Sequence, residues 1–412
     1  MERFKRTHEY IKKSWLKCIK KKDNRKDFIL PFDFVPPCVN GSLTDLYYWD
    51  TYFTNKGLIL DGFSNYALNN INDLTFCLDR FGCVPNMCRA NGADYASQPP
   101  LLVFMVDDYY RFTNDKAFLL DGYNHLVAEY KFWEEKRKFE NGLNHYGTNK
   151  TYSGNGQQSV AEYVTRCNAD LSSFTDEEII ELMYHKTAEG ESGEDHTPRF
   201  NDKAFFVAPI DLNSYLYGFE KLMSKFAIIL NNGESAVWED KANTRLDLIN
   251  KYCYDIDSGV YFDYNVKENK KTFVYCAACY VPFVMGVDND ARGVKRINEK
   301  LLLDHGVTSC EYIKRNAGEV FQWGYPNMWA PHNYWAYVAN NRVGLVDDAR
   351  SIREKYLSVI SDVFNRTGKI YEKYDAITGD RTTFNEYGLP EMLGWTAGVF
   401  ECFYNDYVRE KQ

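Results

Sequence analysis

The sequence predicts an all-α fold in which pairs of helices form a ring around one central cavity, an α/α toroid. Apolar residues recur at helical spacing along most of the chain, with short polar breaks between the segments. Strand patterns are confined to short pieces, and helices do not alternate with strands as a parallel sheet requires. No linker divides the 412 residues. We expect a single domain over residues 1–412, with an N-terminal helical segment at about residues 1–30.

Each expected helix has the period of an amphipathic helix. Before the polar middle of the chain, the expected helices are 8–20, 50–60, 64–80, 100–113 and 115–136. After it they are 203–231, 234–253, 272–285, 290–303, 330–340, 344–365 and 391–410. Residues 259–264 have a strand pattern that follows a turn, and a short β-hairpin insertion is expected there. Residues 140–158, rich in Gly, Ser and Asn, are expected to form a long loop.

Composition limits the classes of function. The aromatic fraction of 16% is high, and aromatic faces stack on sugar rings, although many of these residues must simply be core. The net charge of −9 argues against nucleic acid and anionic membranes as partners. The N-terminus has no secretory signal pattern, and no apolar run reaches 18 residues. A cytoplasmic location is therefore expected. The odd number of cysteines in the chain is consistent with reduced thiols in a reducing compartment.

No metal or cofactor is expected from the sequence. Cys276 and Cys279 have CxxC spacing, but they lie in the apolar run 273–285 without a second pair. We interpret them as buried packing residues. The seven histidines show no spacing typical of metal ligands, so the predicted site contains organic side chains alone.

An acidic stretch at residues 191–200, Glu-Ser-Gly-Glu-Asp-His-Thr-Pro-Arg-Phe, is the first candidate for catalysis. Its glycine and proline predict a loop. Glu191, Glu194 and Asp195 are close in sequence, and a neighbouring like charge raises the pKa of a carboxyl group. A general acid needs a raised pKa at neutral pH. Taken alone, such a loop is more often solvated surface.

Aromatic and acidic residues recur together outside the expected helices. The clusters are residues 45–50, 85–100, the acidic stretch, 322–331 and 372–395. In a toroid the loops of one end surround the central cavity, so residues far apart in sequence can meet there. Trp and Tyr mixed with carboxylates and amides are suited to binding a polyhydroxylated ligand. The alternative is a set of aromatic loops packed on the rim of the barrel.

These clusters resemble the motifs of a known family. Residues 46–53 (Leu-Tyr-Tyr-Trp-Asp-Thr-Tyr-Phe) and 322–331 (Gln-Trp-Gly-Tyr-Pro-Asn-Met-Trp-Ala-Pro) are similar to the two trehalase signatures. Further matches, in family order, are Pro85-Asn86…Arg89, Gln98-Pro99-Pro100, Glu191-Ser192-Gly193…Asp195, residues 209–213, residues 372–375, Glu386-Tyr387 and residues 394–396. Over roughly residues 30–405 the chain resembles the trehalases, glycoside hydrolase family 37.

The resemblance implies an (α/α)6 barrel and an inverting glycoside hydrolase, related in fold to the family-63 α-glycosidases. The expected substrate is a small α-glucoside, either trehalose or a related disaccharide. By motif position Asp195 matches the general acid and Glu372 the general base. Inversion needs one protonated carboxyl group and one ionised carboxylate, about 6.5–9.5 Å apart. Lys373, next to Glu372, is expected to keep the base ionised.

The resemblance also implies which residues contact the substrate. Trp49 and Asp50 match residues that hold the glucose of the cleaved subsite, and Glu386 matches a binding carboxylate near a lid. Trp329 has an alternative role as buried barrel wall. The complete expected set is Trp49, Asp50, Asn86, Arg89, Gln98, Arg199, Trp323, Trp329, Glu386 and Trp395.

The chain departs from the trehalase pattern where that family has arginines. An arginine is missing from residues 40–43, and Ala96 stands where the family has another. The family's Arg-Pro-Glu-Ser-Tyr element has no counterpart in residues 162–168. In addition, residues 380–385 stand where the family has a glycine run. Each sugar hydroxyl left without its donor costs about 1–3 kcal/mol of binding free energy. We therefore expect an altered leaving-group subsite.

Three alternatives to a trehalase remain open. The first is a glucosylglycerate or mannosylglycerate hydrolase of the family-63 type, whose anionic aglycone would bind Arg89, Arg166 or Arg199. The second is a sugar-binding toroid without catalytic activity. The third is an inverting phosphorylase, which lacks a carboxylate base, so Glu372 counts against it.

Overall fold

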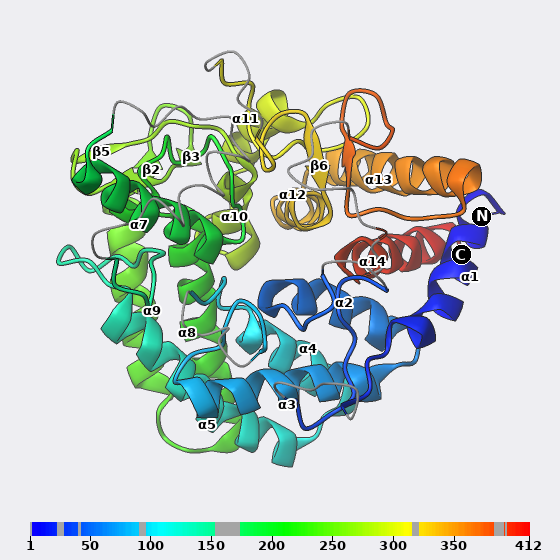
Figure 1. The fold of residues 1–412 in the computed structure, drawn as a ribbon, viewed down its shortest axis with the longest axis horizontal. Coiled ribbons are helices and arrows are strands. Elements are labelled where there is room, and N and C mark those ends of the chain that lie inside the picture. Colours follow the sequence, from blue (N-terminus) through cyan, green and yellow to red (C-terminus); the bar gives the residue numbers. More distant parts are fainter. Residues whose placement is uncertain are drawn as a thin grey trace.

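Two concentric rings of helices make up the fold (Figure 1). The computed structural model describes residues 2–22, 29–39, 43–89, 96–152, 174–314, 321–382, 391 and 394–412. Within these residues, an inner ring consists of α2 (Tyr48–Leu60), α4 (Leu102–Thr113), α8 (Ile210–Leu230), α10 (Val281–Met285), α12 (Ala330–Arg342) and α14 (Gly394–Lys411). Each inner helix contacts the next, and α14 packs against α2 to close the ring.

The outer ring alternates with the inner ring along the chain. It consists of α1 (Glu2–Cys18), α3 (Ser64–Phe81), α5 (Lys116–Lys136), α9 (Ser235–Tyr252), α11 (Ala291–Leu301) and α13 (Val346–Thr367). The N-terminal helix α1 packs on α13 and α14. This alternation confirms the expected (α/α)6 barrel. Across the described ranges, no helix combines the length and apolarity needed to span a membrane.

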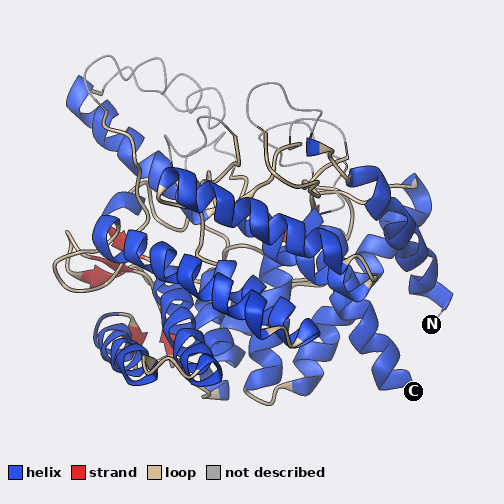
Figure 2. Cartoon of the chain, turned by 90° about the horizontal axis from the view of Figure 1, so that it is seen from below, coloured by secondary structure: helices blue, strands red, loops and turns tan. Residues whose placement is uncertain are grey.

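Short strands lie in the connections between helices (Figure 2). An antiparallel sheet has the order β1 (Val207–Ala208), β4 (Tyr264–Asn265), β5 (Lys270–Lys271), and β2 (Tyr254–Asp255) pairs with β3 (Val260–Tyr261). β6 (Asn327–Trp329) pairs antiparallel with β7 (Lys373–Asp375), so that Trp329 lies opposite Lys373. This last pair places the second signature beside the motif that contains Glu372.

Most expected helices are confirmed to within a few residues, and the exceptions have local causes. The helix expected at 203–231 begins only at Ile210, after a 3-10 turn (η3, Ala204–Phe206) and strand β1. The helix expected at 272–285 shortens to η4 (Ala277–Tyr280) and α10, because Cys276 forms a β-bridge with Cys310. Cys276 and Cys279 are buried free thiols, as the packing interpretation predicted. The strand pattern at 259–264 divides between β3 and β4.

Within the described ranges, one helix was missed. α7 (Asp176–Ser192) stands outside the alternation of the rings and ends inside the acidic stretch that we expected to be a loop throughout. A capping box begins this helix, in which Thr175 and Glu178 exchange hydrogen bonds, and that local pattern could have revealed it. Residues 140–152 form the expected loop, and residues 153–158 lie outside the described residues.

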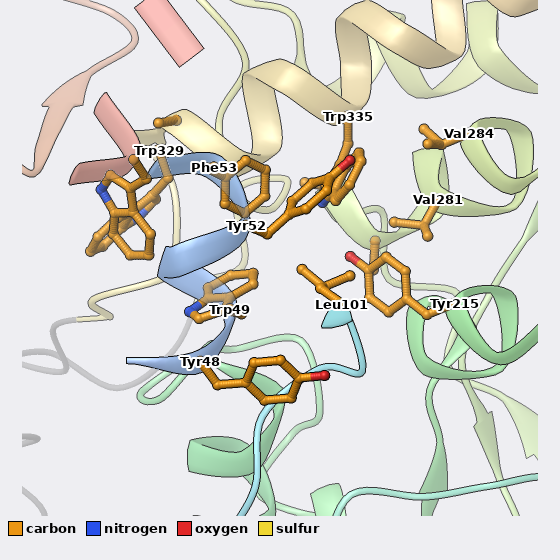
Figure 3. Close-up of a cluster of buried hydrophobic side chains, with 14 of the residues drawn as sticks. Tyr48, Trp49, Tyr52, Phe53, Leu101, Tyr215, Val281, Val284, Trp329 and Trp335 are labelled. Atoms are coloured by element: carbon orange, nitrogen blue, oxygen red, sulfur yellow. The ribbon is translucent and has the colours of Figure 1, made fainter. Parts of the chain in front are cut away.

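The first inner helix is buried on nearly all sides. Tyr48, Trp49, Tyr52 and Phe53 of α2 are buried, and the last three lie among aromatic side chains from other parts of the chain, such as Trp329 and Trp335 (Figure 3). The Tyr52 ring stacks on that of Trp335 in α12, with centroids 5.6 Å apart. A helix without a polar, solvent-facing side suits a core position, and in α2 even the polar side chains Asp50, Thr54 and Asn55 are buried.

Glycines allow α2 and α14 to touch backbone to backbone. A Cβ atom on Gly57 would lie 2.8 Å from the Cα of Gly398, and one on Gly398 would overlap the carbonyl oxygen of Phe53. Neither neighbour is a flexible side chain that can move aside. The close contact of these two helices therefore requires glycine at both positions.

We expect Gly398→Ala to lower the free energy of unfolding by about 3 kcal/mol, because the added methyl group must push α14 away from α2. The measurement is chemical denaturation followed by circular dichroism. Gly190→Ala is the matched control, since Gly190 is also in a helix and a Cβ there meets nothing within 4 Å. The control is expected to be neutral or stabilising by up to about 1 kcal/mol. Equal effects of the two variants would contradict this account of the helix contact.

Candidate active site

The sequence motifs lie where inner helices begin. Residues 45–47 precede α2, Pro99 and Pro100 precede α4, and strand β6 leads directly into α12. Because outer and inner helices alternate, all inner helices run in the same direction and their N-terminal ends meet at one end of the barrel. The unpaired N–H groups and positive dipole ends of these helices favour negative or hydroxyl oxygen atoms there.

Four tryptophans from separate motifs form one cluster at this end. Trp323 stacks on Trp329 with ring centroids 3.8 Å apart and an interplanar angle of 7°. Trp395 meets both rings edge-on, at 5.5 Å from Trp329 and 5.8 Å from Trp323. Trp49 lies 5.7 Å from Trp395 and 5.5 Å from Trp323. The structure thus brings together the four tryptophans that the sequence analysis selected, and all four are buried.

Three carboxyl groups from distant segments share one electrostatic environment. Asp50 lies in the first turn of α2 and is buried. Burial, followed by the nearby carboxylates of Glu372 and Asp195, raises the pKa of Asp50 well above its ordinary value. Glu372 is only 2% exposed, whereas Asp195 is half-buried. The two predicted catalytic residues, Asp195 and Glu372, are remote in sequence from Asp50 and from each other. Both nevertheless act on Asp50 in the folded chain.

The backbone of Glu372 is held from α14. The Trp395 Nε1–H group donates to the carbonyl oxygen of Glu372 at 3.1 Å, and the Thr396 hydroxyl donates to the same oxygen at 3.4 Å. Lys373 donates to Gln322, and its ammonium lies 4.8 Å from the centroid of the Trp329 ring. Lys373 thus joins its own strand to the second signature.

The crowding of carboxylates expected from the acidic stretch does not form. Glu191 accepts hydrogen bonds from Arg137 Nε at 2.7 Å and from the backbone N–H groups of Ser97 and Gly147. Glu194 accepts from His332 Nε2 at 3.1 Å and from an arginine of its own loop. Both neighbours of Asp195 in sequence therefore have donors of their own. The carboxyl groups that share the environment of Asp195 are Asp50, which sequence proximity could not indicate, and Glu189, near the end of α7.

Arg199 is the arginine that holds Glu194, and its role differs from the expected contact with a ligand. It has no exposed surface. Its Nε and Nη2 atoms donate to Asp263 at 2.8 and 2.9 Å. Nη2 and Nη1 donate to Asp211 at 2.7 and 3.1 Å, and Nη1 donates to Glu194 at 3.3 Å. All five N–H donors are used, so Arg199 anchors the acidic stretch to the start of α8.

Gly193 explains how the acidic stretch approaches the tryptophan cluster. It ends α7 with a φ of 80°, in the left-handed region. A Cβ atom at this position would lie 2.7 Å from the indole ring of Trp49. Both the backbone conformation and the lack of space require glycine at position 193. Asp195 follows two residues after this point of contact with Trp49.

The loop that contains Asn86, Arg89 and Gln98 caps α2. Gln98 Oε1 accepts from the backbone N–H of Trp49 at 3.0 Å, and the carbonyl oxygen of Asn86 accepts from that of Tyr48 at 3.1 Å. Asn86 and Arg89 are half-buried. Among the described residues, Arg89 Nε has no hydrogen-bond partner although the atom is buried. Glu386 lies outside the described residues.

Sequence analysis missed several residues that position the site. These are Arg137, His332, Asp211 and Asp263, each of which binds a residue of the acidic stretch. Asp211 lies inside a quoted motif and His332 directly follows the second signature, so both could have been found by position. Arg137 and Asp263 have no local signal, because their partners are far away in sequence.

The double ring and the cluster of carboxyl groups and tryptophans at its end define a class, the (α/α)6-barrel proteins of the glycoside hydrolase type. Within that class, the trehalase family model matches residues 2–407, and the chain belongs to the trehalase family.

Individual relatives agree with this assignment. The chain is 28% identical over 389 residues to a trehalase of Homo sapiens, covering 89% of this chain and 65% of the relative. It is 27% identical over 403 residues to a trehalase of Apis mellifera, covering 89% and 62%. The chain therefore spans slightly less than two thirds of these curated relatives.

Solved structures show the same fold. A neutral trehalase from Saccharomyces cerevisiae superposes with a TM-score of 0.76 at 24% identity, covering 97% of this chain and 79% of that one. A GH63 mannosylglycerate hydrolase from Thermus thermophilus, in complex with Tris and D-glycerate, gives a TM-score of 0.63 at 15% identity, covering 97% and 99%.

We expect Arg199→Met to lower the free energy of unfolding by about 3–5 kcal/mol, because it leaves buried carboxylates without their cation. Denaturant titration at neutral pH measures the change. Arg350→Met is the control, since Arg350 also binds two carboxylates, Asp347 and Glu410, but lies on the surface. Its effect should stay below about 1 kcal/mol. A loss for Arg199→Met as small as that of the control would show that the carboxylates do not depend on this guanidinium for compensation of their charge.

Proposed function

We propose that this protein hydrolyses an α-glucosidic bond in a small α-glucoside, trehalose or a related disaccharide, with inversion at the anomeric carbon. The observation that carries the proposal is the shared environment of Asp50, Asp195 and Glu372 beside the tryptophan cluster. Inverting hydrolysis uses two carboxyl groups on opposite faces of the sugar. Membership of the trehalase family supports the same reaction.

The proposed mechanism assigns different protonation states to the two carboxyl groups. Asp195 donates its proton to the glycosidic oxygen as the bond from that oxygen to the anomeric carbon breaks. Glu372 accepts a proton from a water molecule, whose oxygen bonds to the anomeric carbon from the opposite face. At the end Asp195 is ionised and Glu372 protonated, and exchange with solvent restores both. The half-buried position of Asp195 suits a group that must meet the leaving-group side.

Asp50 has a proposed role in binding. Its raised pKa favours a protonated carboxyl group, which can donate one hydrogen bond and accept another from sugar hydroxyls. A neutral Asp50 also avoids a second negative charge near the ionised Glu372. Stacking on the faces of Trp49 and Trp395 is the proposed contact for the apolar side of the sugar ring.

The leaving-group subsite remains the open part of the proposal. Of the departures from the trehalase pattern, residues 40–42, 162–168 and 383–385 lie outside the described residues, as does Arg166. Ala96 is buried, and its carbonyl oxygen accepts from the backbone N–H of Asn86 at 3.0 Å. We propose that Asn86, Arg89 and, from its motif position, Glu386 contact the second half of the substrate.

A second candidate is a glycoside with an anionic aglycone, such as a glucosylglycerate. The buried Nε of Arg89, which lacks a partner among the described residues, favours a ligand that brings a carboxylate. The fold likeness to the mannosylglycerate hydrolase is compatible with this candidate. We also propose a cytoplasmic location, supported by the free thiols of Cys276, Cys279 and Cys310.

Asp195→Asn and Glu372→Gln should each lower kcat by at least about a hundredfold, because each removes a group that transfers a proton. Glucose release is the assay, and circular dichroism verifies folding. Asp347→Asn and Glu299→Gln make the same chemical changes on the surface and should retain full activity. Wild-type rates in either catalytic variant would remove that residue from the mechanism.

Substrate preference separates the two candidates. We expect glucose release from a panel of trehalose, kojibiose, nigerose, maltose, isomaltose and glucosylglycerate, with β-glucose as the first anomer seen by proton NMR. If trehalose is the best substrate, other residues replace the missing arginines. If glucosylglycerate is best, Arg89→Gln should raise its KM much more than that of a neutral disaccharide. Appearance of α-glucose first would contradict inversion.

A further inference from the structure

Three potential metal ligands from different helices converge far from the proposed active site. His8 lies in α1, Asp61 directly follows α2, and Glu401 lies in α14. One ligand atom of each residue lies within 4.8 Å of the others. Among the described residues, this is the group of three His, Cys, Asp or Glu side chains close enough to hold a metal ion together. Asp61 and Glu401 are buried, whereas His8 is half-buried and open to solvent on one side.

The hydrogen bonds around these side chains leave a buried oxygen of Glu401 unused. His8 Nδ1 and Glu401 Oε2 are 2.6 Å apart, and Asp61 Oδ2 accepts from Trp15 Nε1 at 2.6 Å. Glu401 Oε1 is buried and has no hydrogen-bond partner in the described part of the chain. A buried oxygen of this kind is costly unless something binds it.

The surroundings orient the three side chains. The His8 ring stacks on Tyr404, with centroids 4.6 Å apart and an angle of 24° between the planes. The Trp15 indole fixes one oxygen of Asp61 and leaves the other available. Outer contacts of this type hold metal ligands in place in known sites.

We propose that His8, Asp61 and Glu401 bind one divalent cation of the zinc class, with water as the remaining ligand. One imidazole and two carboxylates suit zinc and its neighbours in the first transition row, whereas calcium and magnesium prefer oxygen atoms alone. Binding replaces the proton that His8 and Glu401 share, and that proton leaves to solvent. A small inward movement of the side chains would bring all three ligand atoms to bonding distance.

The local charges are compatible with a cation. Burial raises the pKa of Glu401 to about 7, and burial also raises that of Asp61, so two carboxyl groups lie where ionisation is unfavourable. The cationic groups that face them are His8 itself and Lys12, one turn further along α1. A divalent ion would compensate both carboxylates, and Lys12 on the exposed surface opposes it only weakly.

The position indicates a structural role for the ion. Asp61 lies eleven residues after Asp50 along α2, which corresponds to roughly 16 Å along the helix axis, away from the catalytic end. The cation would connect the first outer helix to the closing pair of the inner ring, α2 and α14. Binding should therefore raise the melting temperature of the chain rather than change its catalytic mechanism.

The test is a zinc titration of the full chain after treatment with a chelator, followed by calorimetry and thermal melting. The wild type should bind one equivalent and melt at a higher temperature with zinc. His8→Ala and Glu401→Gln should each weaken binding by at least about a hundredfold and lose the thermal shift. His125→Ala is the matched control, because His125 is another helical histidine beside a carboxylate, Asp79, and it should bind like the wild type.

Cobalt(II) provides an independent readout of the ligands. The proposal expects weak visible bands of a nitrogen and oxygen site, and their loss in Glu401→Gln. An intense near-ultraviolet thiolate band would assign the metal to cysteines and overturn the proposal. Absence of saturable zinc binding, or unchanged binding in both His8→Ala and Glu401→Gln, would also overturn it.

Discussion

The buried ion pairs of Arg199 are the interaction on which the geometry of the site depends. One guanidinium binds Glu194, Asp211 and Asp263, which come from the acidic stretch, the start of α8 and the residue before β4. Burial raises the pKa of Asp263 to about 6 even with the arginine beside it, so ionisation there is costly. A buried arrangement of this kind adds little net stability, but it tolerates only one placement of its members. The acidic stretch, which contains Asp195, is therefore held in one position against the start of α8.

The barrel itself fixes the positions of the other members of the site. Inner helices that run in one direction bring their N-terminal ends together, and the glycine contact between α2 and α14 accompanies the contact of Trp49 with Trp395. The pair β6 and β7 then attaches Glu372 to the tryptophan cluster. Rigid elements thus hold each member of the site, which is what proton transfer over a fixed separation requires.

Much of this arrangement could be predicted because it is local. Periodicity located the helices that pack with one apolar face. The aromatic and acidic clusters were expected in loops at one end of a toroid, but Trp49, Asp50 and Trp395 lie in the first turns of α2 and α14. Periodicity failed at α7, whose acidic sequence has little apolar pattern, and at residues 272–276, which are irregular apart from a β-bridge at Cys276. Those residues are ordered by partners elsewhere in the chain, such as Cys310 for Cys276.

The sequence by itself determined the fold class, the family and the kinds of residue at the site, because these depend on spacing and order along the chain. Only the tertiary structure decided which side chains meet. It directed Glu191 to Arg137 and Glu194 to His332, buried Arg199 among three carboxylates, and brought the distant Asp50 into the electrostatic environment of Asp195. The physical reason is that a local pattern reports which face of a segment is buried, whereas charge pairing and pKa depend on what the folded chain places against that face.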